Sequence, residues 1–321
     1  IKKRIKNDNH TTHCRNYTLH NPGLQHRLPV IVYHSVKVLP PPVSILARLP
    51  GPSLPCSFLP IKKTKVIIPA IYSFLQQDYP RELYDIIVIS DQMQESTNEA
   101  LRQLPVRLLI ADYTDSSKAK AMSLAMNATA DIPYDAVVIM DADNTAGTSF
   151  LSELNPVFQS GARAVQAHRT AKNTNTDIAV LDAASEEINN SIFRSGHIAL
   201  GLSSALIGSG MALEACWFRQ HIHLLETAGE DKEMEALLLK QRIHIEYLEH
   251  VYVKDEKTQK KEGIKNQRKR WIAAQFDSLV RTLPDFPKEL LRGNIDYCDK
   301  VFQWTLLPRI ILIFCTFFSP Y

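Results

Sequence analysis

The chain has 321 residues, of which 45% are hydrophobic, so it is long enough for one large domain or two smaller ones with a full core. Its formal net charge is only +3, which argues against a nucleic-acid-binding protein. The five cysteines are scattered and include no CxxC pair. This pattern argues against a zinc knuckle or a disulfide framework and favours a reducing compartment.

The first 60 residues differ in composition from the remainder. They hold eight Lys or Arg against one acid, together with nine of the 18 prolines and five of the 11 histidines. Proline fixes φ and lacks a backbone donor, so the stretches Pro40-Pro41-Pro42 and Pro50-Gly51-Pro52 cannot lie inside a helix or a central strand. We therefore expect residues 1–60 to be a disordered basic leader, followed by a single catalytic domain over residues 61–285.

Strand-like and helical patterns alternate from Lys65 onward. Apolar runs predict strands at residues 66–69, 84–91, 106–110 and 136–140, and helical patterns fall at 96–101 and 118–128. This alternation indicates βαβ units, and hence an α/β fold with a mostly parallel sheet. In the second half we expect helices at 231–240 and 259–276, and short strands at 243–247 and 251–253.

Acidic residues follow two of the predicted strands. Asp91 ends the second strand, and Asp141-Ala142-Asp143 follows the fourth. Ligands of parallel sheets bind at the carboxyl ends of strands, and Mg²⁺ and Mn²⁺ prefer carboxylate and phosphate oxygens. The pair therefore indicates a metal that carries a phosphorylated substrate, although a turn or a helix N-cap would use the same residue types.

Two further polar signatures lie in the second half. Glu230-Asp231 precedes a helical pattern, where it fits either a helix start or a general base that removes a proton from an attacking hydroxyl. Gln267, Arg270 and Trp271 fall on neighbouring faces of one helical turn. Arginine can clamp a diphosphate and tryptophan can pack on a sugar ring, while the alternative is a solvated basic helix with its Trp in the core.

These three signatures, in this order, resemble the processive branch of the family-2 glycosyltransferases, which contains cellulose, chitin and hyaluronan synthases. The resemblance covers roughly residues 62–320. It implies a GT-A nucleotide-binding domain and an inverting, metal-dependent transfer of a sugar from a UDP-sugar to a glycan acceptor. Mg²⁺ or Mn²⁺ is the implied cofactor, and no nucleic acid is involved. A non-processive transferase with a lipid or short glycan acceptor, or a degenerate transferase that acts as a scaffold, is the alternative.

The resemblance also implies roles for residues of the donor site. Asp91 would contact the uridine, Lys118 would lie near the nucleotide, and Asp143 with Asp141 would hold the metal and the donor. Asp231 would be the catalytic base.

The acceptor side of the site follows from the same resemblance. Gln267, Arg270 and Trp271 would lie near the acceptor and the diphosphate, and Gly208 and Ser209 of the Gly208-Ser209-Gly210 loop beside the acceptor. The acidic and amide side chains at 186, 187, 189 and 190 fit either an acceptor path or, as we favour, a solvated helix face.

The chain departs from the family at three places. The loop that follows the first strand of the family is expected to be deleted here, because the apolar run 66–70 leads directly into Ile71. In addition, Ser123 replaces an asparagine of the family. Residues 286–321 end in an apolar run that fits an interfacial helix, the start of a membrane helix or a buried terminal helix. We expect membrane association, with the catalytic domain on the cytoplasmic side.

Overall fold

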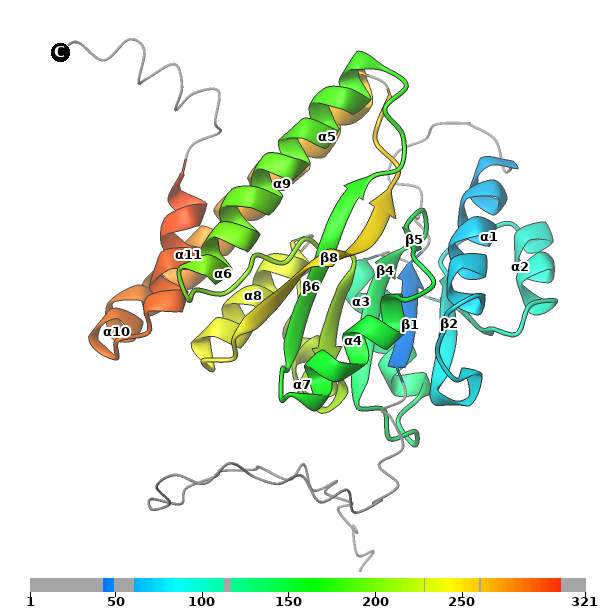
Figure 1. Ribbon diagram of the computed structural model, residues 1–321, viewed down its shortest axis with the longest axis horizontal. Helices are drawn as coiled ribbons and strands as arrows, with labels where there is room; N and C mark the ends of the chain where they lie inside the picture. Colours follow the sequence, from blue (N-terminus) through cyan, green and yellow to red (C-terminus); the bar gives the residue numbers. More distant parts are fainter. Residues whose placement is uncertain (1–42, 49–60, 113–116, 228, 260, 307–321) are drawn as a thin grey trace, which may run out of the picture. The chain divides into compact units, whose positions relative to one another are not determined.

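The computed structural model describes residues 43–48, 61–112, 117–227, 229–259 and 261–306. They form an α/β structure around one sheet of eight strands in the order β3-β2-β1-β4-β7-β6-β8-β5 (Figure 1). The strands are β1 Val43–Arg48, β2 Tyr84–Ser90, β3 Arg107–Ile110, β4 Ala136–Asp141, β5 Thr145–Ala146, β6 Ala164–Ala171, β7 Met211–Glu214 and β8 Ile245–Asp255. Four neighbouring pairs are parallel and three are antiparallel, so the described sheet is mostly parallel, as expected.

The helices follow the chain order around this sheet. They are α1 Ile61–Leu75, α2 Glu95–Arg102, α3 Lys118–Ala128, α4 Phe150–Gln159, α5 Asp177–Asn190, α6 Gly196–Ala199, α7 Ala215–His221, α8 Glu230–Lys240, α9 Lys261–Thr282, α10 Phe286–Leu291 and α11 Ile295–Thr305. A π-helical turn, Ser191–Ser195, joins α5 to α6, and a 3-10 turn, Ile222–Leu224, follows α7.

Helices cover both faces of the sheet because successive side chains of a strand point to opposite faces. In β2, Ile86 and Val88 pack with α1, α2 and α4, whereas Ile87 and Ile89 pack with α3, α7, α8 and α11. The all-apolar runs of β2 and β4 are therefore those of strands buried on both faces.

The predicted strand at residues 66–69 is wrong, because these residues lie in α1. Ile67, Ile71 and Phe74 are buried at intervals of four and three residues, which is helical spacing. The run Val66-Ile67-Ile68 is too short to reveal its period from sequence. The strand at this place in the sheet is β1, paired in parallel with β2 and β4.

Strand β1 also changes the interpretation of the N-terminal segment. Val43–Arg48 belongs to the sheet, so this part of the expected disordered leader is ordered. Residues 49–60 separate β1 from α1. The predicted deletion of the loop after the first strand is therefore wrong, because it took residues 66–69 as that strand. The rest of the leader lies outside the described residues.

The cysteines differ from expectation at one position. Cys216, on α7, is disulfide-bonded, which the scattered spacing did not predict. Cys298, on α11, is a buried free thiol, and burial raises its pKa above the usual value.

The C-terminal helices α9 and α11 pack against each other and against α8, and α10 packs against α11 (Figure 1). Within the described ranges, no helix combines the length and the apolar character that a membrane crossing requires. Of the predicted membrane segment 286–321, residues 307–321, with most of its apolar run, lie outside the described residues.

Two histidine–aspartate pairs join α11 to the remainder of the domain. His197 Nε2 lies 3.1 Å from Asp299 Oδ2, and His244 Nδ1 lies 3.7 Å from Asp296 Oδ2. A hydrogen bond to Asp299 raises the pKa of His197 and one to Asp296 raises the pKa of His244. The pKa of each aspartate is lowered, because its histidine partner outweighs the effect of burial.

These pairs predict that α11 is held less tightly as the pH rises. A histidine whose pKa is raised on folding adds stability that is fully present below its unfolded value, about 6.5, and is lost as the pH passes the folded value. We expect the free energy of unfolding in urea to fall as the pH rises above about 6.5. The His197→Gln/His244→Gln variant should show a flatter profile, and an unchanged slope would contradict the assignment.

Candidate active site

The site lies where β2 and β4 end. Asp91 follows β2 directly and is buried. The next residue, Gln92, has φ +55°, a left-handed conformation that is uncommon for a residue with a side chain. Asp141 is the last residue of β4, and Asp143 lies in the turn that follows. Because β1, β2 and β4 are parallel, both acidic segments lie at the carboxyl edge of the sheet, as predicted.

Lys118, the first residue of α3, connects the predicted motifs. Its Nζ donates to Asp141 Oδ1 at 2.8 Å and to the carbonyl of Gly208, and it lies 3.6 Å from Glu230 Oε1. Ser117 caps the helix by accepting a hydrogen bond from the backbone N–H of Lys120, and so fixes the position of this turn. Burial alone would lower the pKa of Lys118, but Asp141, Glu230 and Asp231 together raise it. The ammonium is therefore a permanently charged link between three segments.

The loop Gly208-Ser209-Gly210 packs against this lysine. Gly208 has φ +76°, and a Cβ there would lie 3.4 Å from Lys118 Nζ and 3.7 Å from Asp231 Oδ2. The glycine thus lies between the lysine and the predicted base. Ser209 Oγ accepts a hydrogen bond from the backbone N–H of Asp141 and donates to Asn144 Oδ1. The loop is thus joined to Lys118 and to the end of β4, while its predicted place beside the acceptor stays a prediction.

Asp143 lies among other carboxylates. Burial raises its pKa to about 7, and the charges of Asp255 and Asp141 add to the increase. Asp255, at the end of β8, was not predicted from the sequence. In the described part of the chain, no preformed group of three His, Cys, Asp or Glu side chains is arranged to hold a metal ion. The neighbouring carboxylates of Asp143, Asp141 and Asp255 nevertheless fit the binding of a divalent cation that also has ligands from a substrate.

Glu230 and Asp231 form the first turn of α8. Burial and the charge of Asp231 raise the pKa of Glu230, while Lys118 opposes both. Asp231 is only partly exposed, with Oδ1 accepting from the backbone N–H of Lys232 and Oδ2 lying 3.7 Å from Lys232 Nζ. Acids in a first turn are stabilised by the helix dipole, so the helix-start interpretation also holds. The two interpretations are compatible.

Helix α9 carries Gln267, Arg270 and Trp271, and it packs against α8, which begins with Glu230 and Asp231. A Cβ on Gly229, just before α8, would lie 2.9 Å from Ala274 Cβ, so the two helices are tightly packed there. Gln267 Oε1 accepts from Thr258 Oγ1 at 3.4 Å. Arg270 is exposed and Trp271 is 45% exposed, so the alternative of a core Trp is wrong. Arg270 forms no ion pair with any other described residue.

A buried ionic network beside the site was missed by sequence analysis. Arg169, on β6, binds both carboxylate oxygens of Glu186 at 3.0 and 3.1 Å. Lys257 Nζ contacts Glu186 as well and lies 3.0 Å from Asp255 Oδ2. These cations outweigh burial and lower the pKa of Glu186 to about 2. The solvated helix face that we favoured for Glu186 is therefore wrong, and Asn190 is buried too.

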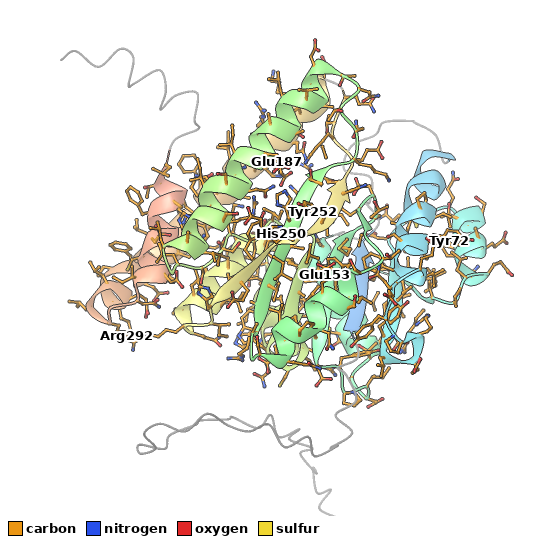
Figure 2. The ribbon with its side chains drawn as sticks, in the orientation of Figure 1. Tyr72, Glu153, Glu187, His250, Tyr252 and Arg292 are labelled. Atoms are coloured by element: carbon orange, nitrogen blue, oxygen red, sulfur yellow. The ribbon has the colours of Figure 1, made fainter. Side chains whose placement is uncertain are left out.

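The residue that follows Glu186 in α5, Glu187, belongs to a second group of polar contacts. Glu187 Oε2 lies 3.1 Å from His168 Nε2, and the His168 ring packs against Tyr252 of β8 with a centroid distance of 5.0 Å. Figure 2 labels Glu187 and Tyr252 on the facing elements α5 and β8. Tyr247 also contacts this histidine, with its hydroxyl 2.8 Å from Nδ1. Helix α5 is thus attached to the strands by charged and aromatic groups that follow no sequence motif.

Comparison with known proteins gives one family and several related folds. A family model described as "Glycosyltransferase like family 2" matches residues 61–274. No curated protein matches the chain. The structure of the mannosyltransferase PcManGT from Pyrobaculum calidifontis, in complex with GDP-Man and Mn²⁺, is 15% identical with a TM-score of 0.53, over 88% of this chain and 77% of that one.

A second solved structure is that of S. aureus TarS 1–349, which is 11% identical with a TM-score of 0.49. The match covers 75% of this chain and 65% of that one, so the chain spans slightly less than two thirds of TarS 1–349. The family match and the likeness to PcManGT identify the α/β architecture described above as GT-A-like.

Proposed function

Because the chain belongs to the glycosyltransferase like family 2, we propose that it transfers a sugar from a UDP-sugar to a glycan acceptor in polysaccharide synthesis. The observation that carries this proposal is the position of Lys118, which joins the acidic end of β4, the glycine loop and the first turn of α8. A nucleotide-sugar has a diphosphate that needs cationic groups and an anomeric carbon that needs a nearby base. The cluster supplies both within one site.

Each residue of the site has a separate proposed role in the transfer. Asp231 would accept the proton of an acceptor hydroxyl while the hydroxyl oxygen forms a bond to the anomeric carbon. The bond from that carbon to the diphosphate breaks, and UDP leaves from the opposite face, which inverts the configuration. Asp91 would contact the uridine, as the resemblance implies. Gln267, Arg270 and Trp271 would approach the diphosphate and acceptor when substrate is bound.

Asp141 and Asp143 would hold Mg²⁺ or Mn²⁺, which supplies positive charge against the leaving diphosphate. Asp141 is also the partner of Lys118, so the lysine holds that carboxylate in place before donor binds. Burial, followed by the charges of Asp255 and Asp141, raises the pKa of Asp143, and a bound cation would offset those charges.

Membrane association is part of the proposal. Ile272, Phe276, Val280 and Leu283 are exposed and recur at helical intervals along α9 and just beyond it. Such a stripe suits a helix that lies in a membrane interface. The catalytic domain would then face the cytoplasm. A non-processive transferase that adds one sugar to a lipid or short glycan is the second candidate, and a product with a single added sugar would favour it.

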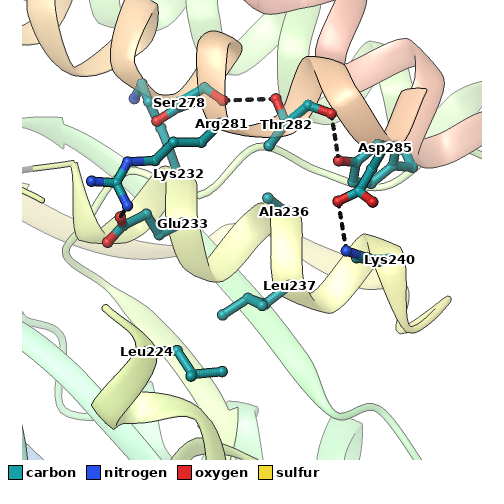
Figure 3. A pocket seen from close by; sticks show the side chains of 11 residues that line it. Leu224, Lys232, Glu233, Ala236, Leu237, Lys240, Ser278, Arg281, Thr282 and Asp285 are labelled. Carbon is teal, nitrogen blue, oxygen red and sulfur yellow. Dashed lines mark hydrogen bonds and ion pairs between the residues drawn. The ribbon is translucent and has the colours of Figure 1, made fainter. Parts of the chain in front are cut away.

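The test is calorimetric binding of UDP to the purified chain, with and without Mn²⁺. We expect binding that depends on Mn²⁺ and is lost in Asp143→Ala, because this variant removes a carboxylate from the proposed metal site. Asp285→Ala is the matched control, since it removes a carboxylate that pairs with Lys240 at the far end of α8 from the site (Figure 3). Absence of UDP binding under both conditions would instead favour a degenerate transferase that acts as a scaffold.

A further inference from the structure

A buried glutamine of β6 binds the loop Gly208-Ser209-Gly210 and the residue before it. Gln166 is 0% exposed, and its Oε1 accepts a hydrogen bond from the backbone N–H of Ile207 at 3.1 Å. Its Nε2 donates to the carbonyl of Ser209 at 3.0 Å and to that of Gly210 at 3.1 Å. Both polar atoms of one side chain therefore fix the path of the backbone over residues 207–210.

The sheet alone does not call for a polar side chain at this position. The residues around Gln166 in the strand, Ala164, Val165 and Ala167, are buried and apolar. A buried amide costs free energy unless its donors and its acceptor are satisfied. Among the described residues, the carbonyl of Ala167, at 2.9 Å, is the one partner of this amide that lies outside residues 207–210. The amide is therefore matched to the loop.

The loop in turn holds two groups of the proposed donor site. The Gly208 carbonyl accepts a hydrogen bond from Lys118 Nζ, and Ser209 Oγ accepts one from the backbone N–H of Asp141 at 2.9 Å. Glycine adopts many backbone conformations, so this loop needs outside bonds to keep one of them. Because Gln166 binds the residues before and after Gly208, it fixes the direction of the carbonyl that Lys118 contacts.

We propose that Gln166 is a positioning residue of the donor site. It acts through the loop, which presents the Gly208 carbonyl to Lys118 and the Ser209 hydroxyl to Asp141. Loss of its bonds would release the loop and with it the acceptors of both groups. The effect on donor binding rests on the proposed function, whereas the ordering of the loop does not.

The test compares two buried glutamines that each bind a turn of backbone. Gln77, just after α1, is 8% exposed, donates to the carbonyls of Ser73 and Gly147 at 2.7 Å, and accepts from the Leu151 N–H at 3.0 Å. Methionine is unbranched like glutamine but lacks its amide. Gln166→Met and Gln77→Met therefore remove similar sets of hydrogen bonds at different places, and melting temperatures measure the general loss of stability.

Two measurements are made on the full chain and on each variant. The first is hydrogen–deuterium exchange of residues 207–210, followed by mass spectrometry, and the second is calorimetric binding of UDP in the presence of Mn²⁺. We expect Gln166→Met to speed the exchange of these amides about tenfold and to weaken UDP binding about tenfold, the scale of one lost hydrogen bond. Gln77→Met should change neither, while its melting temperature falls by a similar amount.

Gln166→Glu separates hydrogen bonding from packing, because the two side chains have the same shape. Burial raises the pKa of a carboxyl group, and the neutral acid can still donate one hydrogen bond to a loop carbonyl, which the carboxylate cannot. Exchange relative to the parent chain should therefore increase as the pH rises above about 4.3, the ordinary glutamate value. Lys118, Arg169 and Asp231 lie beside the same loop in both proteins, so comparison at equal pH removes their contribution.

Unchanged exchange of residues 207–210 in Gln166→Met would overturn the proposal. If that variant does not fold, unchanged exchange in Gln166→Glu at high pH would do the same. Faster exchange without any loss of UDP affinity, or an equal loss of affinity in Gln77→Met, would also contradict it. If the parent chain itself binds no UDP, the proposed function fails, and the exchange measurement still decides whether Gln166 orders the loop.

Discussion

Replacing Asp231 by asparagine should lower the rate of sugar transfer by about 10²- to 10⁴-fold, the contribution of a positioned general base, while UDP binding is retained. Asparagine has nearly the same shape but cannot take up the acceptor proton at neutral pH. The Asp231 carboxylate lies beside Gly208, and the preceding residue, Glu230, pairs with Lys118. Asp231 is therefore part of the cluster around Lys118. Transfer is measured as sugar incorporation from UDP-sugars, with UDP affinity measured by calorimetry on the same preparation.

Glu233→Gln provides the matched control. It removes one negative charge from the same first turn of α8, and its amide oxygen can still accept from the backbone N–H groups of Glu226 and Thr227. If loss of charge at the helix terminus were the cause, both variants would lose activity equally. Full turnover by Asp231→Asn would exclude this residue as the base.

Much of the first half of the domain could be predicted from hydrophobic periodicity alone. The predicted helix 118–128 coincides with α3, and the predicted strand 136–140 lacks only the last residue of β4. These elements are long or strongly patterned, and β4 ends in the polar residue Asp141. The run 66–69 failed because three β-branched residues fit a strand as well as a buried helix face, and only Ile71 and Phe74 decide between them.

The charge network could not be predicted, because its members are brought together by pairing of distant strands. Arg169 lies on β6, Lys257 follows β8 and Glu186 lies on α5, so no sequence spacing relates them. The pairing of β6 with β8 shifts register between Ala167 and His168, and this irregularity lies next to Arg169. Side-chain period predicts which face is buried, but it does not predict which buried charges will meet.

Replacing Lys118 by methionine should destabilise the fold by about 3–5 kcal/mol, because removal of one partner leaves a buried charge without compensation. The lysine side chain is 10% exposed, as is that of Glu230, its partner at 3.6 Å. The free energy of unfolding in urea measures the effect without reference to activity. Lys120→Met, at an exposed position in the first turn of the same helix, controls for the loss of a positive charge and should differ little from the parent.

The double variant Lys118→Met/Glu230→Gln separates the ion pair from simple packing. If Lys118→Met destabilises the fold because the Glu230 carboxylate loses its partner, the neutral glutamine at position 230 should restore part of the free energy of unfolding. The coupling energy between the two substitutions should then be about 0.5–3 kcal/mol. If Lys118 acts only through its carbon chain, methionine alone would be tolerated and the coupling would be near zero. UDP binding of the double variant adds a second distinction. A stable double variant without UDP affinity would mean that the lysine contacts the nucleotide in addition to holding the acidic residues together.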